Sequence, residues 1–344
     1  MATLVSVVIP TYNRAQLLKE TIASVVNQSY RNIECLVIDD YSADNTRQVV
    51  ESFTGNEIPV RYIRNLRRKG AQGARNYGVE MASGEYVQFL DSDDLIHAKK
   101  IELQVEVFDK NEQIDMVFCL DEYFSNRIGD THLLWNLPND KSYIDRFLYD
   151  DAVFHTSSPL WKKQFILRNK IVWDERLSCW QDWDFHLKAL ISGVRHLYIP
   201  YVLNFIRDHT ELRSLNINIL SKLESKLISV FTIAFELKNR NELTEERKRY
   251  LTTFLYSLTL DIYFNSKVLS SHSKNELFKK IIGDLKVVYG PSGRLSVLSF
   301  LRGLLFFSKF EIRIFRKVFS VLMNVSNFPS HTWKLIKSIE YRLN

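Results

Sequence analysis

The amino-acid sequence predicts an α/β fold built on parallel β-strands. Short apolar runs rich in β-branched residues recur through the first half of the chain, and segments with apolar side chains at helical spacing lie between them. Aspartates follow directly on two of these runs. Strands that alternate with helices in this way form parallel sheets with right-handed crossovers. Such sheets bind ligands beyond the carboxyl ends of their strands.

The first strand is predicted at residues 4–9, a nearly continuous apolar run of the kind that is buried on both faces of a parallel sheet. Pro10 is expected to end this strand. Ser42 or Asp44 is a candidate N-cap for the second helix, which ends near Phe53. The other predicted elements of this half are strands 33–38, 60–63 and 86–90 and helices 15–28 and 70–82.

The second half of the chain is less regular. We predict a helix over 101–108 and strands over 116–120 and 197–205, whereas residues 121–150 give mixed signals and no assignment. From about Asn216 onward the apolar residues keep helical spacing. The predicted organisation is therefore an α/β domain over 1–215, with 1–115 and 116–215 as its two halves, followed by a helical region over 216–344.

Composition limits the class of protein. The chain has 344 residues, of which 46% are hydrophobic, so it is large enough for a folded protein with a substantial core. Its three cysteines, Cys35, Cys119 and Cys179, are far apart and lie in or next to apolar runs. We therefore expect reduced thiols in a reducing compartment, with neither a disulfide framework nor a zinc site. We expect no signal peptide, and no run approaches the roughly 20 apolar residues that span a bilayer.

The positive charge of the chain is concentrated at its end. From Pro291 onward nine Lys or Arg stand against two acids, a net charge of +7, while the whole chain carries +6. Residues 301–323 are rich in Phe, Leu and Ile with basic residues interspersed, a composition typical of helices on anionic membrane surfaces. A helix that packs on the main domain with a solvated basic face explains the pattern equally well. No nucleic-acid-binding motif accompanies this tail.

The acidic stretch Asp91-Ser92-Asp93-Asp94 directly follows the strand predicted at 86–90. Carboxylates this close together repel one another, and hard oxygen ligands at alternate positions suit Mg²⁺ or Mn²⁺. Mg²⁺ in proteins is usually held by one or two carboxylates together with substrate phosphates. The alternative is a solvated acidic turn that caps a helix beginning near Ala98.

Polar and aromatic residues also follow the first two strands of the predicted sheet. Pro10 and Tyr12 come after the first strand, and Asp39 and Asp40 after the second. Because parallel strands end at one edge, a single crevice can collect these residues together with the acidic stretch. An aromatic ring for a base, a carboxylate for a base or ribose and a metal for phosphates together indicate a nucleotide site.

Gly70 and Arg75 open the third predicted helix, where an arginine can face phosphates. A solvated arginine near a helix start is the simpler interpretation. The sequence contains neither GxxxxGK[ST] nor a GxGxxG after its first strand, so it lacks the fingerprints of P-loop and Rossmann dinucleotide sites.

Asp182 lies between two tryptophans, Trp180 and Trp183, an environment that can raise a carboxylate's pKa and offer flat faces to a sugar ring. A helix N-terminus, with the acids near its positive end and the tryptophans in the core, is the alternative. His209 follows the strand predicted at 197–205, and a lone histidine there is either structural or a ligand.

These segments together resemble the family 2 glycosyltransferases, which are inverting nucleotide-sugar enzymes with the GT-A fold. The resemblance covers about the first 215 residues and includes the following segments in the family's order: Val5 to Arg14, Val37 to Ser42, Gly73 to Gly78, Gly84 to Asp94 and Gln181 to Trp183. It implies a GT-A fold, a Rossmann-like mixed sheet flanked by helices, with a helical C-terminal extension. It also implies that 1–115 is the nucleotide-sugar-binding half and 116–215 the acceptor half.

The resemblance implies a role for each matched residue. Asp182 corresponds to the catalytic base, and Asp93 to the most direct metal ligand, with Asp91 contacting the ribose or the metal. His209 resembles a histidine that completes the metal site in some relatives. Gln181 departs from the glutamate that the family often has, which affects acceptor contacts. The residues implied to bind the donor, with uracil as the typical base, are Pro10, Tyr12, Asp39, Asp40, Gly70, Arg75, Asp91 and Ser92.

The implied activity is metal-dependent, inverting transfer of a sugar from a nucleotide-sugar, typically UDP-linked, to a hydroxyl of a glycan or lipid-linked saccharide. The implied cofactor is Mn²⁺ or Mg²⁺. The implied process is assembly of a surface polysaccharide such as capsule or lipopolysaccharide, by a cytoplasmic enzyme peripheral to the inner face of the membrane. Two alternatives stay open: a nucleotide-sugar-binding module without turnover, and a metal-dependent nucleotidyltransferase, which releases pyrophosphate.

Overall fold

A computed structural model describes residues 2–208, 218–264, 269–270, 272–273, 276–277 and 279–281. Its chain divides into two compact units, and in the described part the first ends at Ser229 and the second begins at Val230. The predicted boundary between 215 and 216, the basic tail and His209 all lie outside the described residues.

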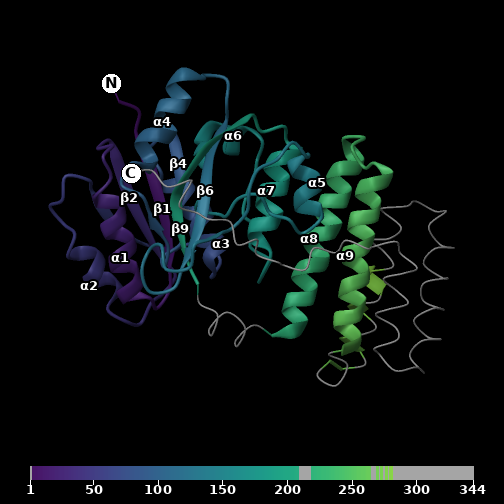
Figure 1. The fold of residues 1–344 in the computed structure, drawn as a ribbon. Coiled ribbons are helices and arrows are strands. Elements are labelled where there is room, and N and C mark those ends of the chain that lie inside the picture. Colours follow the sequence, from purple (N-terminus) through teal and green to yellow (C-terminus); the bar gives the residue numbers. More distant parts are fainter. Residues whose placement is uncertain are drawn as a thin grey trace. The chain divides into compact units, whose positions relative to one another are not determined.

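The first unit is built on one mixed sheet (Figure 1). Its strand order is β3-β2-β1-β4-β8-β6-β9-β5, with β7 paired to β6. The four strands from β3 to β4 are parallel, β8 is antiparallel to both of its neighbours, β6 and β9 are parallel, and β5 is antiparallel to β9. The strands are β1 (Val5–Thr11), β2 (Ile33–Asp39), β3 (Val60–Arg64), β4 (Tyr86–Phe89), β5 (Leu95–Ile96), β6 (Met116–Phe124), β7 (Leu133–Leu134), β8 (Leu160–Lys162) and β9 (His196–Arg207).

Helices flank this sheet on both faces (Figure 1). They are α1 (Ala15–Val26), α2 (Thr46–Glu51), α3 (Ala71–Met81), α4 (Lys100–Lys110), α5 (Tyr143–Leu148), α6 (Lys163–Arg168) and α7 (Gln181–Ile191). Helix α8 (Ile219–Asn239) begins in the first unit and continues into the second, which also contains α9 (Glu245–Phe264). Among the described residues, no helix combines the length and the apolar character needed to cross a bilayer.

Alternation along the strands separates the two faces of the sheet. Odd-numbered residues of β1 such as Val7 pack in one apolar cluster with Ile22 of α1 and Val105 of α4. Val8 points to the opposite face, where α3 crosses the strand so closely that a side chain at Gly78 would meet it. Because β1 and β2 are buried along their whole length, the sheet fixes where their ends emerge.

The strands and helices predicted in the first half of the chain are confirmed, but the end of the first strand differs from the prediction. Strand β1 does not end at Pro10 but continues to Thr11, and Pro10 pairs in register with Ile38. The ladder of β1 to β4 ends with the bond from Leu90 N to Val8 O. The next backbone donor of β1 on the β4 side would be the N–H of residue 10. Because the ladder has already ended there, a proline at this position leaves no hydrogen bond unmade.

The region 121–150 contains the end of β6, the short strand β7 and helix α5. Ser142 caps α5, since its hydroxyl accepts from Asp145 N. Neither predicted cap of α2 is its N-cap, which is Asn45. Asp44 instead accepts bonds from the backbone and hydroxyl of Thr46 within the first turn.

The close approach of α3 to β1 yields a stability prediction. A Cβ on Gly78 would lie 2.2 Å from Cγ1 of the fully buried Val8. We expect Gly78→Ala to lower the free energy of unfolding by about 1–3 kcal/mol, the usual cost of overpacking. Urea denaturation measures this cost. In the double variant Val8→Ala/Gly78→Ala the two losses should be less than additive, because the clash is removed; strict additivity would contradict the packing described.

Candidate functional site

Two buried aspartates end β2, and each is held by donors from other segments. Asp39 accepts a hydrogen bond from the Tyr62 hydroxyl at 2.7 Å. Asp40 accepts from Asn65 Nδ2 and from the backbone N–H of Gly70, both at 2.8 Å. Gly70 has φ of +127°, a conformation that favours glycine. The two carboxylates are therefore fixed in position at the carboxyl edge of the sheet, by which we mean the edge where β1, β2 and β4 end.

Two tyrosines stand beside these aspartates. Tyr12, which follows β1, is 50% exposed, and Tyr41, which follows Asp40, is 40% exposed. The ammonium group of Lys69 lies 5.2 Å from the ring centroid of Tyr12 and 5.7 Å from that of Tyr41. Exposed aromatic rings with a cation between them can stack on a flat group that carries negative charge.

Arg75 of α3 is the most buried cation at this edge. Its Nη2 donates to Asp91 Oδ1 at 2.6 Å, and its guanidinium carbon lies 4.4 Å from the ring centroid of Trp173. The residue is only 5% exposed, and among the described residues its Nε and Nη1 have no hydrogen-bond partner. An arginine with donors left over can hold an anion or ordered water in addition to Asp91.

Asp93 faces the start of α1. Its Oδ2 accepts from Nη1 of Arg14 at 2.6 Å, and the side chain of Arg14 is 48% exposed. Ser92 is buried between Asp91 and Asp93. The guanidinium group therefore occupies one oxygen of the carboxylate that the sequence predicts as the most direct metal ligand.

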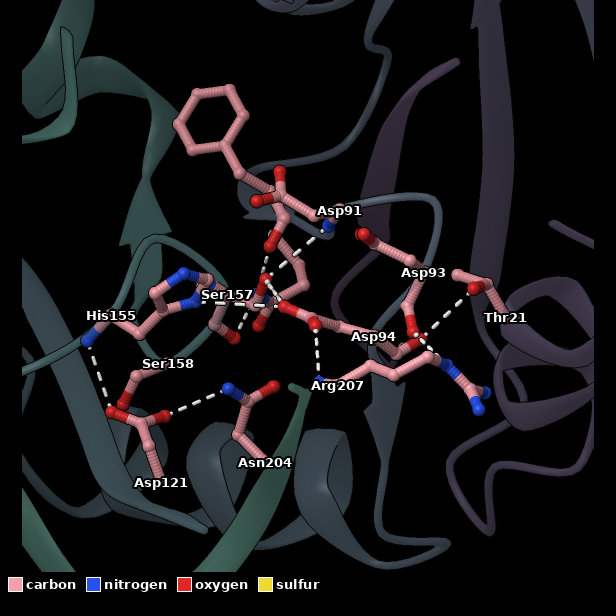
Figure 2. Close-up of polar contacts among 12 residues, drawn as sticks. Thr21, Asp91, Asp93, Asp94, Asp121, His155, Ser157, Ser158, Asn204 and Arg207 are labelled. Carbon is pink, nitrogen blue, oxygen red and sulfur yellow. Dashed lines mark hydrogen bonds and ion pairs between the residues drawn. The ribbon is translucent and has the colours of Figure 1, made fainter. Parts of the chain in front are cut away.

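Asp94 points away from this edge into a buried polar network (Figure 2). It accepts from the Ser157 hydroxyl and from Arg207 N, each at 3.1 Å, and its Oδ2 lies 3.6 Å from Nδ1 of His155. Burial raises the pKa of Asp94 well above its ordinary value, and the charges of Asp93 and Asp91 raise it further. A cation beside Asp94 would offset this penalty.

Asp121 fixes the loop that carries His155. This carboxylate lies in β6, and its Oδ2 accepts from His155 N at 3.0 Å while its Oδ1 accepts from Asn204 Nδ2 at 2.8 Å (Figure 2). Burial raises its pKa as well. Two carboxylates, Asp94 and Asp121, thus lie together with the imidazole of His155 behind the carboxyl edge.

The residues present fit a divalent cation. Ligand atoms of Asp91, Asp94 and His155 all lie within 4.8 Å of one another. Carboxylate oxygens suit Mg²⁺ and Mn²⁺, and Mn²⁺ also accepts an imidazole nitrogen. This group differs from the predicted ligands Asp91, Asp93 and His209. It shares Asp91 with them, and His209 lies outside the described residues.

Asp182 occupies the first turn of α7. Its Oδ1 accepts from Trp183 N at 2.9 Å, and the side chain is partly exposed. One turn later Phe185 packs edge-on against Phe89, with ring centroids 5.7 Å apart. Phe89 ends β4, so this contact holds the start of α7 toward the strand end that carries Asp91.

Hydrogen bonds join several of the predicted site residues to one another. Asp40 is linked to Gly70, and Arg75 of the helix that follows Gly70 is linked to Asp91. In the described part of the chain no hydrogen bond joins Asp182 to Asp40 or Asp91. The contact between α7 and the carboxyl edge is instead the apolar packing of Phe185 on Phe89. Asp182 does lie at a helix N-terminus and Trp183 is buried, as the alternative predicts, but Trp180 is only partly buried and not in the core.

Sequence analysis missed Arg14, Asn65 and His155. Arg14 lies two residues after Tyr12, and that spacing was an available signal. Asn65 follows directly on β3, the same position that Asp40 has after β2. His155 had no local signal, because it lies in a loop whose position is fixed by Asp121.

With the geometry described, comparison with known proteins identifies the class. Residues 6–175 match Glycosyl transferase family 2, so this protein belongs to that family over that segment. The UDP-Glc:alpha-D-GlcNAc-diphosphoundecaprenol beta-1,3-glucosyltransferase WfgD of Escherichia coli is 44% identical over 108 residues, which are 31% of this chain and 42% of that relative. The match therefore spans about two fifths of the relative's length.

Solved structures show the same fold. S. aureus TarS 1-349 in complex with UDP-GlcNAc superposes with a TM-score of 0.62 at 21% identity, covering 83% of this chain and 81% of that one. The mannosyltransferase PcManGT from Pyrobaculum calidifontis in complex with GDP-Man and Mn²⁺ gives a TM-score of 0.50 at 17% identity, covering 96% and 88%. The predicted GT-A fold is confirmed.

The buried face of α7 yields a prediction on pH. His186 is 1% exposed, and neither ring nitrogen has a hydrogen-bond partner among the described residues. Burial lowers its pKa from 6.5 to about 3, with smaller contributions from His155 and Arg75. Between these values the unfolded chain binds a proton that the folded chain does not, so stability is lost as pH falls below 6.5.

We expect His186→Leu to gain about 2 kcal/mol relative to the wild type between pH 7 and pH 5. Urea denaturation at the two pH values measures this. The control His186→Gln keeps a polar group that does not titrate and should show the same pH-dependent gain. A constant difference from the wild type at both pH values would show that His186 does not cause the acid sensitivity.

Proposed function

We propose that this protein is an inverting glycosyltransferase that transfers a sugar from a UDP-sugar to a hydroxyl of a saccharide acceptor. The observation that carries the proposal is the row of carboxylates at the carboxyl edge, within the segment that matches the family. Asp39 and Asp40 are fixed after β2, and Asp91 and Asp93 follow β4.

On the donor side, Tyr12 stacks on the uracil while Asp39 and Asp40 accept hydrogen bonds from the base and the ribose. Pro10 lies within β1, two positions before Tyr12, on the same side of the proposed site. The backbone at Gly70 approaches the nucleotide closely, since it has no side chain. The unpartnered donors of Arg75 and the hydroxyl of Ser92 face the ribose and diphosphate.

The diphosphate requires neutralisation, and the nearby residues fit a divalent metal ion. Asp91 and Asp93 would hold it from the edge, with an imidazole, His155 or His209, as a further ligand. When bound, Mn²⁺ or Mg²⁺ offsets the charge of the departing nucleoside diphosphate. Arg14, which pairs with Asp93 in this structure, is close enough to turn its exposed guanidinium toward the phosphates.

Asp182 acts as the general base. It takes the proton from the acceptor hydroxyl, whose oxygen attacks the anomeric carbon on the face opposite the departing diphosphate. The new C–O bond forms as the bond to the diphosphate oxygen breaks, so an α-linked donor gives a β-linked product. Asp182 lies at the start of α7 and is partly exposed, which leaves its carboxylate open to an incoming hydroxyl.

For the acceptor we propose a lipid-linked saccharide used in surface-polysaccharide assembly at the membrane. The name of the E. coli relative specifies an acceptor of this kind, a GlcNAc joined through diphosphate to undecaprenol. The basic, aromatic tail from Pro291 onward is suited to an anionic membrane surface.

Calorimetric titration with UDP tests the donor site. We expect UDP to bind in the presence of Mn²⁺, and to bind at least about tenfold more weakly without it or in Asp93→Asn, because a diphosphate beside carboxylates needs a cation. Asp109→Asn, at an exposed acid of α4, is the control and should bind like the wild type. Equal binding with and without metal would contradict the proposed metal role.

Transfer assays test the base. Asp182→Asn should lower kcat by about 10²- to 10⁴-fold, the usual contribution of a general base, with UDP binding retained. Asp184→Asn is the matched control on the same helix, since Asp184 is fully buried against Lys188 and cannot meet a substrate. It should keep transfer activity. Unchanged product formation in Asp182→Asn would remove Asp182 from the mechanism, and release of pyrophosphate would favour a nucleotidyltransferase.

A further inference from the structure

The loop that leads to Asp182 is tied to the first turns of α8, a helix beyond the segment that matches the family. Ser178 N donates to the Ser225 hydroxyl at 2.8 Å, and the Ser221 hydroxyl donates to that of Ser178 at 2.9 Å. The Cys179 thiol donates to Lys222 O at 3.6 Å. All these residues belong to the first compact unit, so α8 is part of the wall beside the candidate base.

Trp180 is held in an unusual conformation at the start of α7. Its φ and ψ of 60° and 20° lie in the left-handed region, which is costly for a bulky residue and persists only when the surroundings enforce it. Its ring lies 5.2 Å from that of Trp183, tilted by 33°. The residue is partly exposed and stands two positions before Asp182. A partly exposed, fixed indole beside a candidate base is suited to pack against a sugar ring.

One lysine of α8 stands next to this indole, and a second lies one turn earlier on the helix. The ammonium group of Lys226 lies 5.0 Å from the centroid of the Trp180 ring, and Lys222 is one turn earlier on the same helix face. Among the described residues, Lys222 forms no ion pair. Burial raises the pKa of the Cys179 thiol, the charges of Lys226 and Lys222 oppose this rise, and that of Asp182 adds to it. The charges of both ammonium groups and of the candidate base therefore act on the same thiol.

We propose that Trp180, Lys222 and Lys226 form an acceptor subsite for a saccharide that carries a phosphate or diphosphate group. The sugar ring packs against Trp180, which brings one of its hydroxyls to Asp182. The phosphate group pairs with the two lysines, which act as flexible point charges. The Gln181 Oε1 atom is buried with no hydrogen-bond partner among the described residues and accepts from a second sugar hydroxyl. This inference rests on the proposed function and adds to it the residues that would hold the acceptor's sugar ring and phosphate group.

Calorimetry with two synthetic acceptors tests the subsite in the full chain. One probe is a decyl diphosphate ester of α-GlcNAc, and the other is neutral decyl α-GlcNAc. The wild type should bind the diphosphate probe more tightly. Lys222→Met/Lys226→Met should bind it about tenfold more weakly, the loss expected for two partly exposed charge-assisted contacts, with the neutral probe unaffected. Trp180→Ala should weaken both probes, and Trp180→Phe should retain most of the binding.

Two controls separate charge at this position from charge in general. Lys222→Arg/Lys226→Arg keeps both charges and should bind the diphosphate probe nearly like the wild type. Lys110→Met, at an exposed lysine that ends α4, should have no effect. UDP binding with Mn²⁺ is measured on every variant, so that loss of the donor site, which would end the proposed function, is distinguished from loss of the acceptor subsite alone.

Equal binding of the diphosphate probe by the wild type and the lysine double variant would overturn the inference. So would failure of the wild type to bind that probe while it still binds UDP. Sedimentation with phosphatidylglycerol vesicles distinguishes the other source of phosphate: if the double variant loses vesicle binding but keeps the diphosphate probe, the lysines serve a membrane surface and not the acceptor.

Discussion

The constraint on which the rest of the structure depends is the charge gathered at the carboxyl edge of the sheet. Parallel pairing of β2, β1 and β4 brings the ends of these strands together, and two of them end in aspartates. Buried carboxylates are costly unless donors or cations offset them. Asp40 is offset by the backbone of Gly70 and Asp91 by Arg75. The same charges that fix the surrounding loops are therefore also the ones that would hold the metal ion and the diphosphate of the proposed function.

The loop from Trp173 to Trp180 connects this edge to α7. Asn76 of α3 bonds Trp173 reciprocally, donating to its carbonyl at 2.8 Å and accepting from its N–H at 3.0 Å. The other end of the loop is held by Ser225 of α8. Because Arg75 also stacks on Trp173, one indole supports the arginine beside Asp91 and begins the loop that ends at the candidate base. The donor side and the base side of the proposed reaction therefore both depend on the position of Trp173.

The sequence predicts most of this edge because its signals are local. Asp39 and Asp91 directly follow apolar runs, and a strand end can be recognised from its own residues. His155 could not be predicted in this way. It approaches Asp94, 61 positions away, because β8 pairs antiparallel with β4 and carries the preceding loop behind the acidic stretch. The strand that makes this pairing, β8, has only three residues. It is too short to show the alternation of apolar and polar residues by which a strand is predicted.

The two aspartates of α7 show how one helix turn can separate a structural acid from a candidate base. Asp184 is fully buried, its partner is Lys188, and burial raises its pKa to about 6. Asp182 lies two positions earlier, where the side chain is partly exposed, and in the part of the chain that the structure describes only Trp183 N donates to it. A buried, paired carboxylate cannot reach an acceptor hydroxyl, whereas one at the open first turn can. Helical periodicity therefore favours Asp182 as the candidate base and leaves Asp184 to the packing of α7.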